Sequence, residues 1–182
     1  WRGTAGSAWD HASTNWVNGV APDRFWRLDA VLFDDTSTNG AVTLAETVEP
    51  RAVVVSNTAR AYMFSGPGCL TGATSLVKTG PGTLTLNPLS TSRLSVTASN
   101  SASVTVSNTA GLVAGMAVAG AGIPAGCRIG AVTATNAVAL TAPATAGGTN
   151  SLTFAAVHSC GGGTAVRRGV LALRRPAANS KA

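Results

Sequence analysis

Acidic residues are missing from every position after Glu49. The seven acids are confined to the first segment, at Asp10, Asp23, Asp29, Asp34, Asp35, Glu46 and Glu49. Three arginines there leave that segment at −4, whereas the rest of the chain has ten Lys and Arg and stands at +10. Three explanations stay open: a basic face for an acidic partner, attraction between the ends of neighbouring copies, and an unevenly charged but solvated surface.

Charged residues make up only 11% of the 182 positions and aromatic residues 5%, while the apolar and aromatic set reaches 45%. Disorder needs low hydrophobicity and high charge, so it is disfavoured. Long helices and coiled coils need Glu, Lys, Leu and Arg in bulk, which this chain lacks. Thr and Val favour strands, while Gly and Asn favour turns, so the composition predicts an all-β fold.

The residues that enzymes use are scarce. Only His11 and His158 are available as bases, and no Gly-x-Ser-x-Gly motif accompanies them. Paired carboxylates that cleave glycosides come from separate elements facing a cleft, but residues 50–182 have no acid. No CxxC motif indicates zinc. We therefore expect no enzyme, no cofactor and no metal site.

Three weaker possibilities are also disfavoured. The aspartates at 29, 34 and 35 offer oxygens that suit Ca²⁺, but we expect them to support turns beside a strand. The arginines towards the end lack aromatic neighbours to stack bases, so we expect no nucleic-acid partner. The apolar part of the uncharged stretch, residues 111–123, is too short for a membrane span.

Short apolar runs between turn residues set the expected organisation. Residues 30–33 and 41–44 flank Asn39-Gly40, which predicts a hairpin. Residues 82–86 recur as 169–173, and such recurrence favours a solenoid of β-coils, although a β-sandwich gives similar local signals.

The uncharged stretch in the second half differs from its surroundings in being rich in Ala, Val, Ser, Thr and Gly. We interpret it as a compact inserted β module. The predicted segments are 1–93 (Trp-rich cap and β-coil framework), 94–158 (inserted module) and 159–182 (final β-coil strand and basic tail).

Several segments together resemble autotransporter-associated β-strand repeat proteins of bacterial surfaces. They are Trp9-Asp10 with Asn15-Trp16, Asp29–Asp34, Tyr62–Gly66, Leu76–Leu86, Gly161–Thr164 and Gly169–Leu173. The resemblance implies a short right-handed parallel β-helix or solenoid-like framework, interrupted by the inserted module. It also implies an exported protein, extracellular or at the cell surface, whose signal peptide has been removed. Because exported proteins meet oxidising conditions, we expect a disulfide between Cys69 and Cys160, with Cys127 left over.

A β-coil cannot bury its faces alone and needs neighbours above and below. We therefore predict an exported structural protein, a subunit of a self-assembling extracellular fibre, sheath or surface layer, whose partners are other copies joined end to end. The expected assembly edge is an apolar strand flanked by arginines: Arg167, Arg168, Val170, Leu171, Leu173, Arg174 and Arg175.

All four tryptophans lie near the start of the chain, at Trp1, Trp9, Trp16 and Trp26. We expect them to cap the open end of the coils. The alternative is a platform on which sugar rings stack, which would make the protein a carbohydrate-binding or adhesin module for cell-surface glycan.

Overall fold

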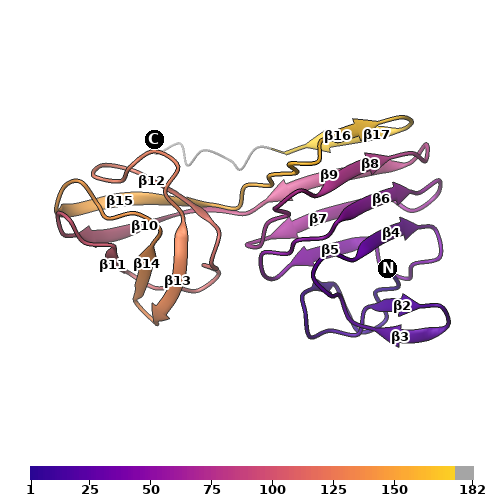
Figure 1. Ribbon diagram of the computed structural model, residues 1–182, viewed down its shortest axis with the longest axis horizontal. Coiled ribbons are helices and arrows are strands. Elements are labelled where there is room, and N and C mark those ends of the chain that lie inside the picture. Colours follow the sequence, from indigo (N-terminus) through magenta and orange to yellow (C-terminus); the bar gives the residue numbers. More distant parts are fainter. Residues whose placement is uncertain (175–182) are drawn as a thin grey trace, which may run out of the picture. The chain divides into compact units, whose positions relative to one another are not determined.

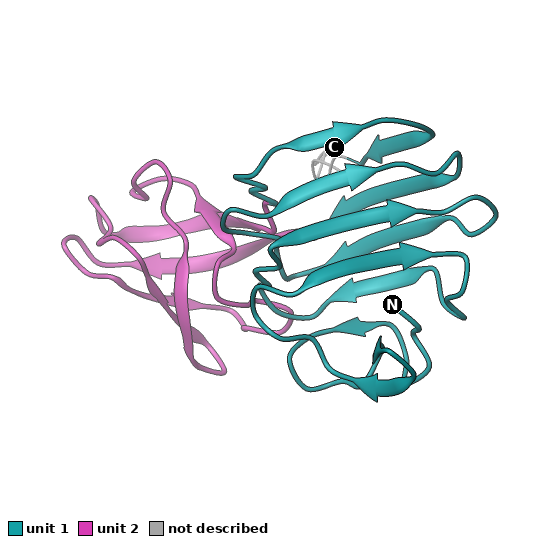
Figure 2. Ribbon diagram, turned by 45° about the vertical axis from the view of Figure 1, so that its right-hand side comes forward, with its two compact units in different colours: residues 1–88, 158–182 teal, residues 89–157 magenta. Residues whose placement is uncertain are grey.

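A computed structural model describes residues 1–174 (Figure 1). These residues form strands, turns and loops but no helix, which confirms the predicted all-β class. Among them, accordingly, no helix is long and apolar enough to cross a membrane. The chain divides into two units, the first made of Trp1–Pro88 and the chain from His158 on, the second of Leu89–Val157 (Figure 2).

Unit 1 contains two parallel sheets, and consecutive strands alternate between them (Figure 1). The first sheet has the order β16 (Thr164–Val166), β8 (Ser75–Lys78), β6 (Ala52–Ser56) and β4 (Ala30–Asp34). The second has the order β1 (Ala8–Trp9), β5 (Ala41–Leu44), β7 (Tyr62–Gly66), β9 (Thr83–Pro88) and β17 (Val170–Leu173). A separate antiparallel pair, β2 (Trp16–Asn18) and β3 (Ala21–Asp23), precedes β4.

Equivalent side chains lie next to one another along each sheet because the strands pair in register. In the first sheet Val31 pairs with Val53, which pairs with Leu76, and all three are buried. In the second sheet Phe64 pairs with Val42 on one side and Leu86 on the other. Burying one such large apolar side chain contributes about 1.5–3 kcal/mol, so these rows are the main source of stability in unit 1.

The echo between residues 82–86 and 169–173 is a structural repeat. Strand β17 pairs in parallel with β9, and the register places Leu171 beside Leu84 and Leu173 beside Leu86. Similar sequences thus occupy equivalent positions on adjacent strands.

The hairpin predicted at Asn39-Gly40 is wrong. The strands on either side, β4 and β5, belong to different sheets and do not pair. A two-residue type I′ turn needs positive φ at both central residues, and neither Asn39 nor Gly40 has it. Instead, the Asn39 side chain accepts the Ala41 N–H, and a Cβ on Gly40 would lie 2.2 Å from the Ala61 carbonyl oxygen on the next connection.

Unit 2 is a single antiparallel sheet with its own core of buried apolar residues. Its order is β12 (Ala117–Ala119), β15 (Gly148–Ala155), β10 (Ser90–Thr97), β11 (Ser103–Val106), β14 (Ala137–Leu140) and β13 (Ile129–Ala134). The predicted start at residue 94 falls inside β10, so the unit begins earlier, at Leu89. No strand was predicted over β10, whose first half is the polar run Ser90–Arg93.

Because each unit has its own core, we predict that unit 1 folds without unit 2. Replacing residues 89–157 by a short Gly/Ser linker should leave a soluble protein with a β-type circular dichroism spectrum and cooperative thermal unfolding. Residues 89–157 expressed alone are measured in the same way, for comparison with the linker variant. A linker variant that is unfolded at all temperatures would contradict this division.

Candidate functional site

An aromatic cluster fills one end of unit 1. Trp9 is completely buried, and Trp1 and Trp16 are each 7% exposed. The ring centroid of Trp16 lies 5.1 Å from that of Trp1 and 5.2 Å from that of Trp9, and Trp9 also packs on Phe33 at 5.4 Å. Such edge-to-face and tilted contacts are the favoured geometries of aromatic packing. These three indoles are therefore core side chains that cover the end of the stacked rows.

Trp26 differs from the other three. Its side chain is 53% exposed, and the Arg24 guanidinium lies over the ring, 4.1 Å from the centroid. It lines a groove of about 570 Å³ beside the edge strand β4, together with Asp23, Asp29 and Asp34. Only this tryptophan has the exposure that a sugar-stacking platform requires.

The three groove aspartates each use one oxygen to fix the local backbone. Asp23 accepts the Arg24 N–H and Asp29 the Trp26 N–H, both at 2.8 Å, and Asp34 accepts the Thr36 N–H at 3.0 Å. Burial alone would raise the pKa of Asp34, but hydrogen bonds from Thr36 and the nearby Arg2 charge lower it. The second oxygen of each carboxylate makes no hydrogen bond within residues 1–174, so each groove carboxylate can accept one from a hydroxyl.

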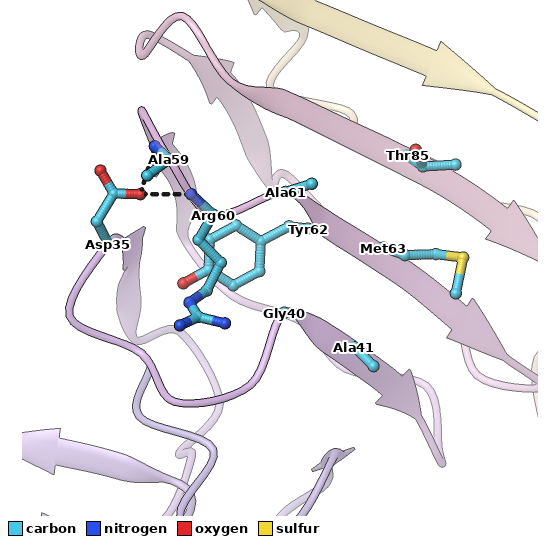
Figure 3. A pocket seen from close by; sticks show the side chains of 9 residues that line it. All are labelled: Asp35, Gly40, Ala41, Ala59, Arg60, Ala61, Tyr62, Met63 and Thr85. Carbon is cyan, nitrogen blue, oxygen red and sulfur yellow. Dashed lines mark hydrogen bonds between the residues drawn. The ribbon is translucent and has the colours of Figure 1, made fainter.

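The remaining acids also serve local structure. Asp35 accepts the backbone N–H groups of Thr58, Ala59 and Arg60 at 2.9–3.1 Å. Figure 3 shows its bonds to Ala59 and Arg60, and the Arg60 N–H is the largest cause of the lowered pKa of Asp35. Asp10 caps the turn at Ser13.

Two glutamates form ion pairs at the surface. Glu46 lies 2.6 Å from His11 and Glu49 lies 2.7 Å from Arg27. Exposed pairs of this kind contribute about 0–1 kcal/mol. In the described part of the chain, no group of three or more His, Cys, Asp or Glu side chains could hold a metal ion.

A second, shallower groove of about 510 Å³ lies over β5, β7 and β9 (Figure 3). Arg60 and Asp35 line one side, and Ala41, Met63 and Thr85 line the rest. The Tyr62 hydroxyl donates a hydrogen bond to the Asp34 carbonyl oxygen at 2.5 Å. Both oxygens of Asp35 already accept backbone N–H groups, and these bonds lower its pKa, so its carboxylate is a weak proton acceptor.

At the other end of unit 1, no residue among 1–174 covers the last strands. Strands β16 and β17 each end their sheet within the described residues, and Val166, Val170 and Leu173 are 49%, 52% and 73% exposed. Within β16 and β17, Leu171 packs partly against the core. Arg167, Arg168 and Arg174 lie beside these strands, as expected, and Arg175 lies outside the described residues.

Lys78 was not singled out by the sequence analysis, yet its side chain is completely buried. It continues the interior row of Phe33 and Val55, and its ammonium group donates to the Gly80 carbonyl. Burial lowers its pKa. The signal was the alternation of Ser75–Lys78, which puts Lys78 on the same face as Leu76.

The cysteines do not show the expected bond. Cys160 is a free, partly buried thiol whose pKa is raised by burial, so the Cys69–Cys160 disulfide is not formed in this structure. Both residues belong to unit 1, and their pairing under oxidising conditions stays a prediction. Cys127 is buried in the core of unit 2.

Comparison with protein-family models, with curated proteins and with solved structures returns no significant match. The resemblance to autotransporter-associated repeat proteins therefore stays a prediction.

We predict that removing Trp9 and removing Trp26 affect stability to very different extents. Trp9→Ala removes a fully buried ring and should lower the free energy of unfolding by about 3–5 kcal/mol. Trp26→Ala removes an exposed ring and should change it by no more than about 0.5 kcal/mol. Urea unfolding followed by circular dichroism measures both free energies. If Trp9→Ala does not fold, Trp9→Phe replaces it, with a smaller expected loss of unfolding free energy. Equal losses at the two positions would refute the assignment of Trp9 to the cap.

Proposed function

We propose that unit 1 is a short parallel β-helix and that the protein is an exported structural subunit, which assembles end to end into an extracellular fibre, sheath or surface layer. The observation that carries this proposal is the contrast between the two ends of unit 1. One end is covered by buried indoles, whereas the other exposes Val166, Val170 and Leu173 on strands that end their sheets.

The pairing pattern supports the β-helix. Each passage of the chain adds one strand to each sheet, since β4 and β5 are followed by β6 and β7 and then by β8 and β9. Parallel strands joined by crossover connections are right-handed in nearly all proteins, which favours the right-handed coil. The resemblance to autotransporter-associated repeat proteins agrees with this arrangement and with an extracellular location.

A second copy is the occupant that best fits the open end. Contact between an open end and a different surface of the next copy is heterologous, and it produces filaments unless the ring closes. The open end carries Arg167, Arg168 and Arg174, while the groove beside edge strand β4 carries Asp23, Asp29 and Asp34. Opposite charges of this kind steer the approach and set its direction. One oxygen of each aspartate is already bonded to the backbone of a turn, which limits how much these carboxylates can contribute to binding. Apolar burial and strand pairing therefore supply most of the affinity between copies.

The assembly is tested at the exposed apolar side chains. The double variant Val170→Thr and Leu173→Thr keeps strand propensity but removes apolar surface, so it should weaken self-association at least about tenfold in sedimentation velocity. The matched control is Leu94→Thr with Val96→Thr, which changes side chains of similar exposure in unit 2 and should leave association unchanged.

Charge supplies the second arm of this test. Reversing Arg167, Arg168 and Arg174 to glutamate should block assembly without unfolding the chain. Salt should slow assembly more than it dissolves finished polymer, because screening acts over about 8–10 Å. A parent protein that stays monomeric at high concentration and low salt would overturn the proposal.

The groove at Trp26 favours a second candidate function, binding of surface glycan. An exposed indole beside three carboxylates, each with one free oxygen, offers a stacking face and hydroxyl acceptors. The role would be that of an adhesin or carbohydrate-binding module.

We predict that Trp26→Ala abolishes any glycan binding detected by calorimetry or on a glycan array. Leu28→Ala, which removes a side chain of similar exposure outside the groove lining, should not affect it. Binding that survives Trp26→Ala would exclude this groove as the glycan site.

A further inference from the structure

His158 is the first residue of unit 1 after the chain returns from unit 2. Its ring nitrogen Nδ1 lies 3.1 Å from the Leu70 backbone nitrogen, whose N–H donates to it. A nitrogen that accepts a hydrogen bond carries no proton, so the ring is neutral and its proton is on Nε2. Leu70 is completely buried and pairs with Val48. The histidine side chain thus satisfies a backbone N–H of the core.

The surroundings of the other ring nitrogen of His158, Nε2, do not stabilise a protonated, charged ring. Nε2 is buried and has no hydrogen-bond partner among residues 1–174. Burial is the cause of the lowered pKa of His158, and no charged side chain of the described residues contributes to the shift. The titratable groups on the two segments that meet here are the thiols of Cys69 and Cys160, which are neutral in acid. The neighbouring segment, whose Val48 pairs with Leu70, carries Glu46 and Glu49, and these carboxylates are paired with His11 and Arg27.

A continuous series of backbone hydrogen bonds runs from His158 to the last strands. Ser159 N–H donates to the Leu70 carbonyl at 2.8 Å, and Gly161 N–H donates to the Gly72 carbonyl at 3.0 Å. Leu76 N–H then donates to the Gly163 carbonyl at 3.0 Å, immediately before β16 pairs with β8. Since β16 is exposed along its whole length, this connection is restrained by these bonds, by the pairing of β16 with β8 and by the packing of Cys160 on the core.

We propose that His158 is a pH-sensitive latch, which holds residues 158–163 and the last strands in place when its ring is neutral and releases them when the ring is protonated. Protonation turns Nδ1 into a donor that faces the Leu70 N–H, and two donors cannot bond to each other. The buried Nε2–H gains no compensating acceptor. The latch is a property of the single folded chain and does not depend on the proposed assembly.

The direction of the pH dependence follows from the lowered pKa. The folded state binds the proton less readily than the unfolded segment, whose histidine has the ordinary value of 6.5. The stability of the latched segment is therefore full above that value and is lost as the pH falls through the lowered folded value.

Amide hydrogen exchange of the whole chain, followed by NMR from about pH 7.5 to about pH 4.5, tests the latch across the range in which histidine titrates. After correction for intrinsic exchange rates, the protection of the Leu70, Ser159 and Gly161 amides should fall by up to about tenfold per pH unit below 6.5, the limit for one linked proton. The amides of Val53 and Phe64, in strands β6 and β7, should keep their protection.

The variant His158→Asn separates the latch from other acid effects, because the Asn side-chain oxygen can accept the Leu70 N–H but does not titrate. It should keep protection at low pH, while His11→Asn, which changes the other histidine, should behave like the parent. The same acid loss in His158→Asn as in the parent would overturn the proposal. So would a His158 ring that titrates at or above 6.5, which the NMR shifts of the parent report even if the variant fails to fold.

Discussion

In-register parallel pairing is the constraint on which the rest of unit 1 depends. Because each strand repeats the register of the one before it, interior side chains fall into rows such as Val31, Val53 and Leu76. A row of this kind covers its own members but leaves its two ends exposed. Within the described residues, the two ends of unit 1 differ in how these rows are covered.

At the end of unit 1 that comes first in the sequence, aromatic side chains cover the rows. Trp1, Trp9 and Trp16 pack over Phe33 and close the row with large rings. At the other end the chain provides no equivalent cover among its described residues: Leu173 is 73% exposed, and buried Lys78 continues the row of Phe33 and Val55. The returning chain is joined to this end by the His158 ring, by backbone hydrogen bonds and by the partly buried Cys160.

The sequence predicted those parts of the fold in which local pattern and long-range pairing agree. The alternation in residues 83–86 and its echo in 170–173 indicated strands, and these strands are neighbours. The Asn39-Gly40 prediction failed because turn type depends on backbone angles that the parallel sheets impose from outside the turn. Strand β10 was not predicted, and its first half, which consists of Ser, Thr and Arg, has no apolar alternation that would indicate a strand.

The sequence indicated which residue types gather at the candidate site, but it did not indicate which of them are buried and which are exposed. Clustering of the tryptophans was visible in the sequence, but nothing local distinguished the exposed Trp26 from the buried Trp9. Likewise, the uneven charge suggested long-range attraction, whereas the structure places each acid in a turn or an ion pair within its own neighbourhood, as for Asp35 and Glu49.

Within residues 1–174, unit 1 is covered by aromatic rings at one end and left uncovered at the other. Amide hydrogen exchange of dilute protein at neutral pH tests it most directly. We expect strong protection in β5, β6 and β7, only slightly less in β4 beside the aromatic cap, and the weakest protection of the two sheets in β16 and β17. Protection in β17 equal to that in β6, or loss of protection in β4 to the level of β17, would contradict the account.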